Sequence, residues 1–462
     1  MMMENMADIK QSMKIFCAGL VMAALLFAPA LPARAQGGGP NIIRDTEIEN
    51  TLKTWVEPLL EASQIDRNGL KIILVESPQV NAFVAGGANI FLYTGLIEKT
   101  DAPGELIGVL GHEMGHITGG HLVITRDAME RASYESILGT VLGIGTAIAT
   151  GNGAAASAII AGGNSVAQRK FLAHSRVNES SADQAALSFF EKAALDPQGL
   201  ASFMYKIESE ELLPASNQSE YVRTHPLTRD RIEAIEARAK NSPYKDKPLP
   251  PEWIEQHARM KAKLVGFINP GRVPWVYDDR DHSVAARYAR TIAAYRTNDI
   301  DKALAGIDDL LQEEPQNPYF HELKGQMLVD FSRIDEGVSS YREAVKLLPD
   351  APLLRMALAH ALIETGRDGA VLEEALKHLR RALKDEPRSA RIYRLMATAS
   401  GRLGEESLAK LYLAEEATLQ RRLPYARQQA ESALSGLKEG SREWLEAKDL
   451  LAHIENLERQ AE

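Results

Sequence analysis

Three prolines in the C-terminal third of the chain recur at nearly regular intervals, and each closes a stretch rich in Ala and Leu at helical spacing. They occur in Glu314-Pro315, Leu348-Pro349 and Glu386-Pro387, so the intervals between them are 34 and 38 residues. A unit of this length is one pair of helices, which cannot bury its apolar face alone and has to stack on neighbouring copies. The last part of the chain is therefore constrained to an all-α solenoid.

The shorter interval equals the period of the tetratricopeptide repeat. Small residues recur where such repeats need close contact between helices, as at Ala303, Gly337 and Ala344, and the extra residues of the longer interval fall near Gly366 to Glu374. Ala and Leu continue at helical spacing from Ala390 to Leu451, which predicts one or two further helix pairs that cap the stack. An irregular helical bundle is the alternative.

The full length of 462 residues predicts two folded domains, because single domains usually run to about 100–200 residues. Prolines cluster between Asn241 and Trp275, which favours a boundary there. We therefore expect a first folded domain at residues 36–242, a proline-rich linker at 243–283 and the repeats at 284–462.

The N-terminus is typical of a secretory signal peptide at residues 1–35. Lys10 and Lys14 precede the apolar run Ile15 to Leu31, and Ala33-Arg34-Ala35 supplies the small-x-small cleavage site, so the mature chain would begin at Gln36. A start of translation at Met13 leaves this interpretation unchanged. The alternative is a retained N-terminal membrane anchor.

Composition excludes several classes of function. The chain carries 63 acidic and 53 basic side chains, a formal charge of −10, which disfavours nucleic acid as the main partner. The single cysteine, Cys17, lies within the signal peptide, so the mature chain would lack disulfides, thiolate metal ligands and cysteine nucleophiles. An exported protein without a stray thiol suits an oxidising compartment.

The first domain combines helices with short strands. Asp45 to Ala62 shows apolar residues at helical spacing, and the β-branched runs Lys71 to Glu76, Asn81 to Gly86 and Ile90 to Tyr93 predict a small sheet. We expect the strand at residues 81–85 to offer its edge to an extended substrate. The nearly uncharged segment at residues 137–161 is interrupted by a Gly-Asn-Gly break, so we expect a mobile flap over the site, with a membrane-dipping segment as the alternative.

The run His112-Glu113-Met114-Gly115-His116 carries the strongest chemical signal. On a helix, residues four apart share one face, so His112 and His116 can hold one zinc ion while Glu113 points toward a water molecule beside it. A carboxylate at that place can take the proton of the attacking water and deliver it to the leaving amine. His121, five residues after His116, falls on a different face and suits a helix-end contact better than a ligand role.

A second pair of acidic residues lies downstream, on a helix expected at Asn178 to Phe190. Glu179 can supply the third metal ligand, and Asp183 lies one turn further, where it can hydrogen-bond a ligating histidine and fix its tautomer. The alternative is that both acids are simply the charged first turn of a helix.

Four sequence features occur in a characteristic order. They are Asn81-Ala82-Phe83 with Gly86-Gly87, the HExxH motif with Gly115 before its second histidine, Glu179-x-x-x-Asp183, and Thr224-His225-Pro226 followed by Arg231-Ile232. Over about residues 45–240 this order resembles the HtpX and CAAX-prenyl-endopeptidase family of gluzincin metallopeptidases. The resemblance implies an α+β, zincin-like peptidase domain, mostly helical with a small sheet, followed by the all-α tetratricopeptide-repeat solenoid.

The resemblance also assigns roles to individual residues. It implies one zinc ion per chain, held by His112, His116 and Glu179, with Glu113 as the general base. Asp183, His225 and Arg231 would complete the catalytic site. His225 and Arg231 would stabilise the oxyanion that forms during hydrolysis, or else His225 would be a removable fourth zinc ligand that keeps the enzyme latent.

Members of this family that join an export signal to C-terminal tetratricopeptide repeats are periplasmic proteins of Gram-negative bacteria. Similarity to them implies a zinc endopeptidase that degrades misfolded or stalled outer-membrane proteins and assists their assembly. It further implies that the repeats bind the outer-membrane β-barrel assembly machinery, with at most peripheral contact to the membrane.

Two other hypotheses compete with this one. The first is a non-enzymatic adaptor or chaperone scaffold with a metal site held shut, which the intact Glu113 disfavours because a scaffold has no use for a general base. The second is a membrane-bound prenyl-protein or lipoprotein peptidase, which lacks support because no true spanning segments occur in the sequence.

Overall fold

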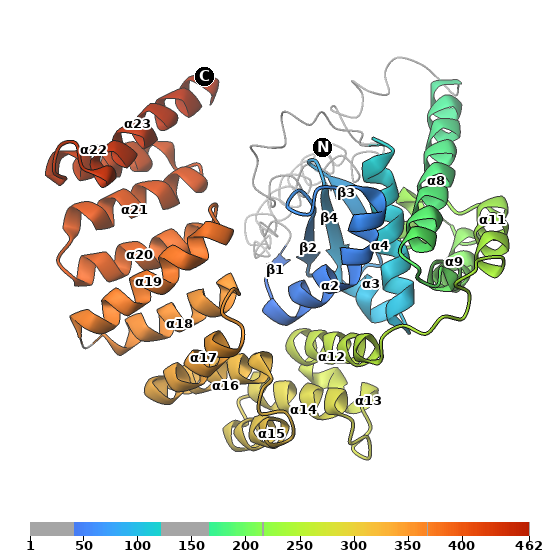
Figure 1. The fold of residues 1–462 in the computed structure, drawn as a ribbon, viewed down its shortest axis with the longest axis horizontal. Coiled ribbons are helices and arrows are strands. Elements are labelled where there is room, and N and C mark those ends of the chain that lie inside the picture. Colours follow the sequence, from blue (N-terminus) through green and yellow to red (C-terminus); the bar gives the residue numbers. More distant parts are fainter. Residues whose placement is uncertain (1–40, 122–165, 215–216, 367, 462) are drawn as a thin grey trace, which may run out of the picture. The chain divides into compact units, whose positions relative to one another are not determined.

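A computed structural model describes residues 41–121, 166–214, 217–366 and 368–461 (Figure 1). The predicted signal peptide at residues 1–35 and the predicted flap at residues 137–161 lie outside these ranges. In the helix Val166–Lys192, side chains are described from residue 176 onward. No helix within the described ranges is both long enough and apolar enough to cross a membrane.

A four-stranded sheet forms the centre of the first domain. Its strands are β1 (Ile42–Ile43), β2 (Lys71–Val75), β3 (Ala82–Ala85) and β4 (Asn89–Tyr93), in the spatial order β1-β2-β4-β3. β2 and β4 are parallel, whereas β1 and β3 each pair antiparallel with their single neighbour. β3 is therefore an edge strand.

The two faces of the sheet follow the alternation of side chains along each strand. Leu74, Ala82, Ile90 and Leu92 face the main core, together with the buried residues of the helices, such as Trp55. The other face carries a separate cluster, built of Ile73, Val75, Phe83, Ala85, Phe91 and Tyr93. Both faces are thus largely apolar, which fits β-branched and aromatic strands with little polar alternation.

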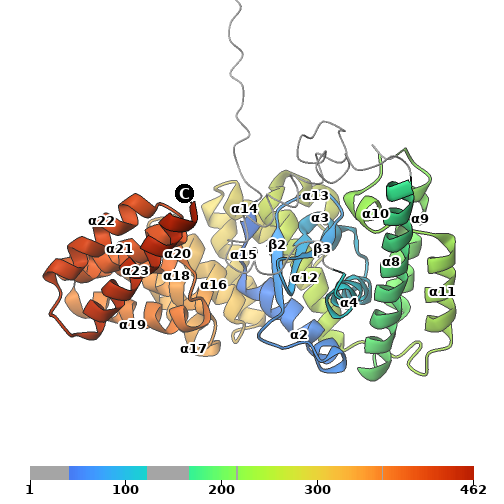
Figure 2. The same cartoon turned by 90° about the horizontal axis from the view of Figure 1, so that it is seen from above.

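Helices cover the main core. They are α2 (Thr46–Ser63), α3 (Thr94–Lys99), α4 (Pro103–Thr118), α8 (Val166–Lys192), α9 (Gln198–Glu211), α10 (Glu220–Thr224) and α11 (Arg229–Lys240). α2 begins where the Asp45 side chain accepts a hydrogen bond from the backbone N–H of Ile48, as an N-cap does. Figure 2 shows α4 between the sheet and α8, so the helix with the HExxH motif lies in the middle of the domain.

The proline-rich stretch between the two parts of the chain contains regular structure. It holds α12 (Pro251–Ile268), the 3₁₀ turn η1 (Pro270–Arg272) and the short α13 (Val273–Val276). Trp253 and Leu264 of α12 join the main core of the first domain, while Ala262 and Val265 pack with Ala289 of the first repeat helix. The domain limits at residues 242/243 and 283/284 stay a prediction, and α12 contacts both neighbours of the expected linker.

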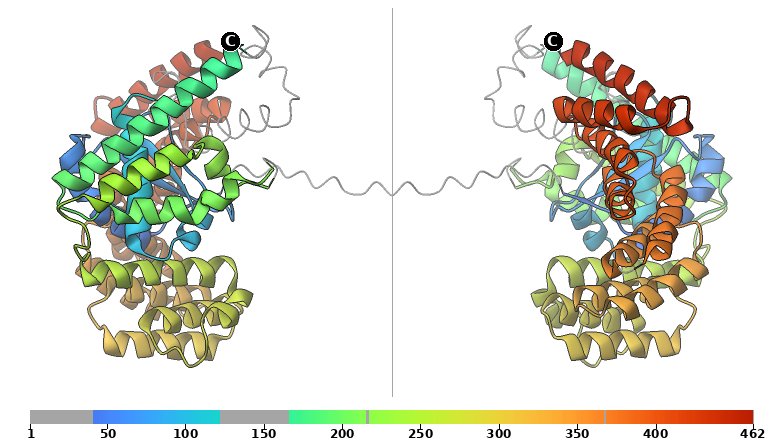
Figure 3. Two further views of the ribbon diagram at one scale, coloured as in Figure 1. Left: turned by 90° about the vertical axis from the view of Figure 1, so that its right-hand side faces the viewer. Right: turned by 90° about the vertical axis from the view of Figure 1, so that its left-hand side faces the viewer.

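Ten helices follow within the described ranges, in antiparallel pairs (Figures 1 and 3). They are α14 (Val284–Arg296), α15 (Ile300–Glu313), α16 (Pro318–Asp330), α17 (Ile334–Leu347), α18 (Pro352–Thr365), α19 (Gly369–Asp385), α20 (Ala390–Arg402), α21 (Glu406–Leu419), α22 (Leu423–Gly436) and α23 (Arg442–Ala461). Each proline of the repeat spacing lies between two helices, as predicted. The longer interval reflects α19, which at 17 residues exceeds the 14 residues of α15 and α17.

A buried polar cluster joins the start of α2 to α12 and α14. The Lys263 ammonium lies 2.8 Å from Asp45 Oδ2 and 3.2 Å from Glu47 Oε2. The Tyr288 hydroxyl donates a hydrogen bond of 3.0 Å to the same Glu47 oxygen. The first repeat helix is therefore fixed to the beginning of the first domain by charge-assisted contacts away from solvent.

Candidate metal centre and active site

Helix α4 supplies two histidines and one glutamate to a buried cluster. The helix begins with Pro103 at its first turn, a position where the missing N–H of proline is harmless. His112 and Glu113 are fully buried, and His116 is partly buried one turn further on. The spacing of four residues places both imidazoles on the same side of the helix, as the sequence predicted.

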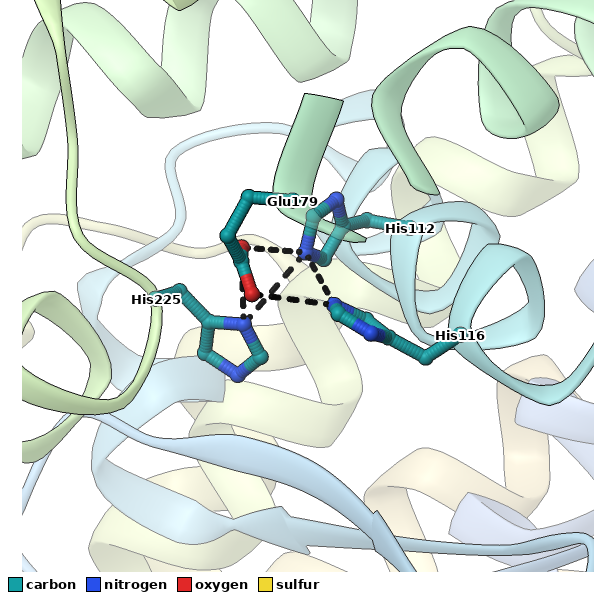
Figure 4. Close-up of side chains that lie close together, drawn as sticks. All are labelled: His112, His116, Glu179 and His225. Carbon is teal, nitrogen blue, oxygen red and sulfur yellow. Dashed lines mark hydrogen bonds and ion pairs between the residues drawn. The ribbon is translucent and has the colours of Figure 1, made fainter. Parts of the chain in front are cut away.

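Helix α8 and the segment after α10 bring the remaining groups to the same place (Figure 4). Glu179 and Asp183 lie one turn apart on α8 and are both buried, and His225 directly follows α10. One ligand atom each from His112, His116, Glu179 and His225 lies within 4.8 Å of all the others. Residues separated by up to 113 positions in the chain are thus gathered around one point.

The distances within this cluster fit a tetrahedral metal ion. His112 Nε2 lies 3.0 Å from His116 Nε2, 3.3 Å from Glu179 Oε2 and 3.4 Å from His225 Nδ1. Glu179 Oε1 is 3.4 Å from His116 Nε2, and Glu179 Oε2 is 3.2 Å from His225 Nδ1. Ligands bound at zinc-like distances of about 2.0–2.1 Å in a tetrahedron would be about 3.3 Å apart. The described residues therefore fit a single metal ion.

Each histidine of the cluster has a neighbour at its other ring nitrogen. His112 Nδ1 lies 2.9 Å from Asp183 Oδ1, and His116 Nδ1 lies 3.2 Å from Nδ1 of His121, just beyond the end of α4. His225 Nε2 donates to the backbone carbonyl of Ala82 at 3.2 Å. Because a carboxylate and a carbonyl only accept hydrogen bonds, His112 and His225 in their neutral form each present a lone pair to the cluster. Burial lowers the pKa of both rings, but the nearby carboxylates raise it by more when no cation is bound.

Arg231 holds the carboxylates in place. Its Nε and Nη2 donate to the two oxygens of Asp183 at 2.7 and 3.0 Å, and its Nη1 donates to the carbonyl of Pro226 at 2.7 Å. The same Nη1 lies 3.2 Å from Glu179 Oε2. The guanidinium is buried and each of its nitrogens has an acceptor, so the geometry favours a role in orienting Asp183 and Glu179.

Glu113 and Tyr221 complete the surroundings. Among the described residues, neither carboxylate oxygen of Glu113 has a hydrogen-bond partner, although Oε1 lies 3.5 Å from His225 Nε2. The Tyr221 ring stacks on His225 with 4.6 Å between ring centroids, and its buried hydroxyl also has no partner in the described part of the chain. The imidazole of His225 therefore stands beside the carboxylate that is predicted to act as base.

Burial and charge shift the protonation of these groups. Burial lowers the pKa of His116 to about 4, which leaves its ring neutral and able to offer a lone pair. Burial raises the pKa of Glu113, and the neighbouring His225 and His112 lower it in part. For Asp183, burial raises the pKa but hydrogen bonds from His112 and Arg231 more than offset this, so its carboxyl stays ionised.

The sequence-predicted site residues are all found together. His112, Glu113, His116, Glu179, Asp183, His225 and Arg231 lie in one buried region of the first domain. Sequence reasoning missed Tyr221 and the carbonyl of Ala82. The position of Tyr221, four residues before His225, could have predicted its contact with that histidine. The role of the Ala82 carbonyl could not have been predicted, because every residue has a backbone carbonyl.

Comparison with known proteins shows what this chain is similar to. Residues 47–239 match Peptidase family M48, and residues 281–442 match a tetratricopeptide repeat family. The β-barrel assembly-enhancing protease of Escherichia coli is 24% identical over 415 residues, which cover 87% of this chain and 82% of the relative. The protein of the same name in Yersinia pestis is 25% identical, and the match covers 90% of this chain and 85% of that relative.

Another relative matches a shorter part of the chain. The mitochondrial metalloendopeptidase OMA1 of Bos taurus is 29% identical over 196 residues, 40% of this chain and 36% of the relative. These matches confirm the predicted order of a metallopeptidase domain followed by tetratricopeptide repeats. The first domain is therefore similar to peptidase family M48, and the protein is a metalloendopeptidase.

Proposed function

We propose that this protein is a zinc-dependent endopeptidase of the bacterial cell envelope that hydrolyses misfolded or stalled outer-membrane proteins. The observation that carries the proposal is the convergence of His112, His116 and Glu179 on one point with Glu113 buried beside them. Two imidazoles and one carboxylate are the ligand set of a catalytic zinc site. One ion per chain is expected.

Zinc is the metal that this donor set favours, since imidazole and carboxylate ligands at tetrahedral spacing suit it. When bound, it would act as a Lewis acid that lowers the pKa of water and polarises the scissile carbonyl. Glu113 would take a proton from the attacking water and return it to the amine nitrogen as the peptide bond breaks. Among the described residues its carboxylate has no hydrogen-bond partner, which leaves it available for that transfer.

Asp183 and Arg231 would act through the ligands. Asp183 holds the proton on His112 Nδ1 and so keeps Nε2 as the metal-binding nitrogen. Arg231 neutralises part of the buried negative charge and fixes both carboxylates. We infer that Arg231 contributes to catalysis by this orientation rather than by contact with the oxyanion, because its three nitrogens already have acceptors.

His225 would act as a latch, by which we mean a removable fourth metal ligand that keeps the enzyme latent. Its Nδ1 lies within ligand distance of the other three groups, and a fourth protein ligand removes the open position that a catalytic zinc needs. It arises from the segment after α10 and not from α4 or α8, so it can leave without disturbing the other three ligands. Stabilisation of the oxyanion is the competing role for the same residue.

The location and the clients follow from the relatives and the sequence. The names of the relatives refer to assembly of β-barrels, and the predicted signal peptide at residues 1–35 would export the chain to the periplasm. The repeats would bind the outer-membrane β-barrel assembly machinery. Edge strand β3 suits extended, unfolded clients because an added strand is recognised by its backbone.

The competing function is an adaptor or chaperone scaffold in which His225 keeps the metal site permanently closed. The four-ligand cluster favours such a state at rest. Glu113 is buried and has no hydrogen-bond partner among the described residues, which favours the enzyme, because an unpaired carboxylate in the interior destabilises the fold and is typical of functional sites.

Digestion of an unfolded substrate by the purified mature chain tests the proposal. We expect cleavage of casein or an unfolded porin that stops when a chelator is added and returns with zinc. Glu113→Gln should keep the zinc content and abolish cleavage, since the amide preserves the shape but cannot accept a proton. Cleavage by this variant above a few per cent of the wild-type rate would exclude Glu113 as the base.

A further inference from the structure

In the part of the chain that the structure describes, one edge of β3 pairs with no other strand, and this free edge has a defined hydrogen-bonding pattern. The Tyr93 N–H donates to the carbonyl of Asn81, so this pair belongs to the β3–β4 ladder. In an antiparallel ladder, alternate residues turn their backbone groups away from the neighbouring strand. Ala82 and Val84 therefore direct their N–H and C=O groups toward the free edge, where an added strand would pair.

The segment that bears His225 already occupies part of this edge. The Tyr221 N–H donates to the carbonyl of Val80 at 3.0 Å, and His225 Nε2 donates to the carbonyl of Ala82 at 3.2 Å. Between them, the side-chain Nδ2 of Asn81 donates to Oε2 of Glu220 at 3.2 Å. The segment thus follows the edge over three consecutive residues and ends at the position where pairing would begin.

The imidazole ring of His225 contacts both the edge strand and the proposed metal ligands. Its Nε2 is bonded to Ala82, and its Nδ1 lies 3.2 Å from Glu179 Oε2. Tyr221 stacks against the ring, so the ring has little room to turn on its own. A polypeptide strand that pairs with Ala82 would place its own backbone beside this carbonyl, in the space that the His225 ring fills, so the two arrangements exclude each other.

We propose that an extended polypeptide pairing with the free edge of β3 displaces His225 from Ala82 and thereby from the metal ligands. The Ala82 carbonyl is then a substrate subsite that is held by His225 at rest. This inference rests on the proposed function and adds the trigger for opening the site. Any client able to form a strand opens the site, whereas a folded protein with no free strand does not.

Zinc affinity gives a readout that does not depend on turnover. Full-length Glu113→Gln protein is titrated with zinc in competition with a chromophoric chelator, with and without a saturating peptide of alternating Thr and Val. Displacement of one ligand should weaken zinc binding, and coupling between sites typically amounts to about 5–150-fold. In Glu113→Gln with His225→Ala the same peptide should leave zinc affinity unchanged.

Two controls separate strand pairing from other contacts. A peptide with the same side chains but N-methylated at every residue has no N–H to donate on either edge, so it should neither bind nor change zinc affinity. Val84→Pro removes an N–H that faces the free edge and no ladder bond to β4, so it should weaken peptide binding while zinc affinity without peptide stays normal. Normal zinc binding also shows that this variant is folded.

Equal effects of the peptide on zinc affinity with and without His225 would overturn the inference, and so would failure of the peptide to bind. Zinc-dependent digestion of casein by the wild-type chain is measured in parallel. If the wild-type chain digests casein but the peptide does not change zinc affinity through His225, the proposed trigger is wrong and the proposed function stands. If no zinc-dependent digestion occurs, the proposed function itself fails.

Discussion

The inner nitrogens of the three clustered histidines face one another, and the outer nitrogens face Asp183, His121 and Ala82. Three imidazoles this close would repel one another if protonated, and neutral rings would leave lone pairs in contact. A bound cation satisfies all three at once. The arrangement of donors and acceptors around each ring is therefore the strongest residue-scale argument for a metal ion.

Glu179 and Asp183 should differ in how their loss affects the metal. Glu179→Ala removes a ligand and should sharply reduce zinc content. Asp183→Ala leaves the ligands but frees the proton of His112, and losses of this kind typically reduce affinity or activity by about 10–100-fold. Zinc titration and peptide cleavage on both variants check the order, and a larger loss for Asp183→Ala would transfer the ligand role to that residue.

His225→Ala separates the two roles of this histidine. A latch predicts higher basal cleavage and self-cleavage with zinc still bound, because the open coordination position becomes permanent. An oxyanion stabiliser predicts turnover that is lower by about 10²–10³-fold. One peptide assay at full zinc occupancy decides between them, and a lower rate would exclude the latch.

At the scale of elements, the site depends on how closely α4 approaches α8. Gly115 faces Ala182 so tightly that a Cβ at residue 115 would lie 2.5 Å from the Ala182 carbonyl oxygen. Glycine is required because any Cβ would clash with the Ala182 backbone, and the proposed ligands His116 and Glu179 lie next to this contact on the two helices. The close approach sets the distance between the histidine pair and the third ligand.

Gly115→Ala should therefore weaken zinc binding by separating the two helices. Overpacking of this kind typically destabilises a protein by about 1–3 kcal/mol, against about 1 kcal/mol gained from replacing glycine in a helix. Gly104→Ala on the same helix is the matched control, since its Cβ would meet ordinary contacts of 3.6 Å and beyond. Equal zinc affinity in the two variants would show that the approach at Gly115 does not set the site.

Sequence patterns predicted most elements because their signals are local. The apolar spacing of α2, the runs of β2, β3 and β4, and the proline period of the repeats were all confirmed within a few residues. β1 has two residues and is defined only by its pairing with Leu74 and Val75, so no local pattern predicted it. α12 was hidden by the prolines around it, although Pro251 only occupies its first turn.

The site was predictable to the extent that spacing fixes geometry. Two histidines four apart on a helix must share a face, and the pair Glu179 and Asp183 obeys the same rule. The place of His225 depends on α10, on Tyr221 and on the edge of β3, which are contacts distant in sequence. Resemblance to a family supplied this residue, and spacing alone did not.

At the scale of the whole molecule, the polar cluster at Lys263 connects peptidase and repeats. Besides Asp45 and Glu47 it includes Glu322 of α16, whose Oε1 accepts a hydrogen bond from Thr46 and whose Oε2 is buried without a partner in the described ranges. One lysine faces three carboxylates. Burial raises the pKa of Glu322 to about 8, with Lys263 lowering it in part and Asp45 raising it further.

Stability should accordingly depend on pH through Glu322. The pKa of this side chain is higher in the folded than in the unfolded chain, so the folded state binds the extra proton. Its contribution is fully present below about pH 4 and is lost as the pH rises through about 8. Glu322→Gln should flatten the decline in thermal stability between pH 5 and about 9, and an unchanged pH profile would contradict the buried, protonated carboxyl.

The ligands of the metal site follow one another in a fixed order along the chain. His112 and His116 come first, Glu179 is made 63 residues after His116, and His225 follows 46 residues later. At the usual speed of synthesis, about 5–20 residues per second, roughly 2–9 seconds pass between the third ligand and the latch. Arg231, which fixes Glu179, is made later still. Under the proposed roles, a newly made chain would acquire its hydrolytic centre and the residue that inhibits it within seconds of each other.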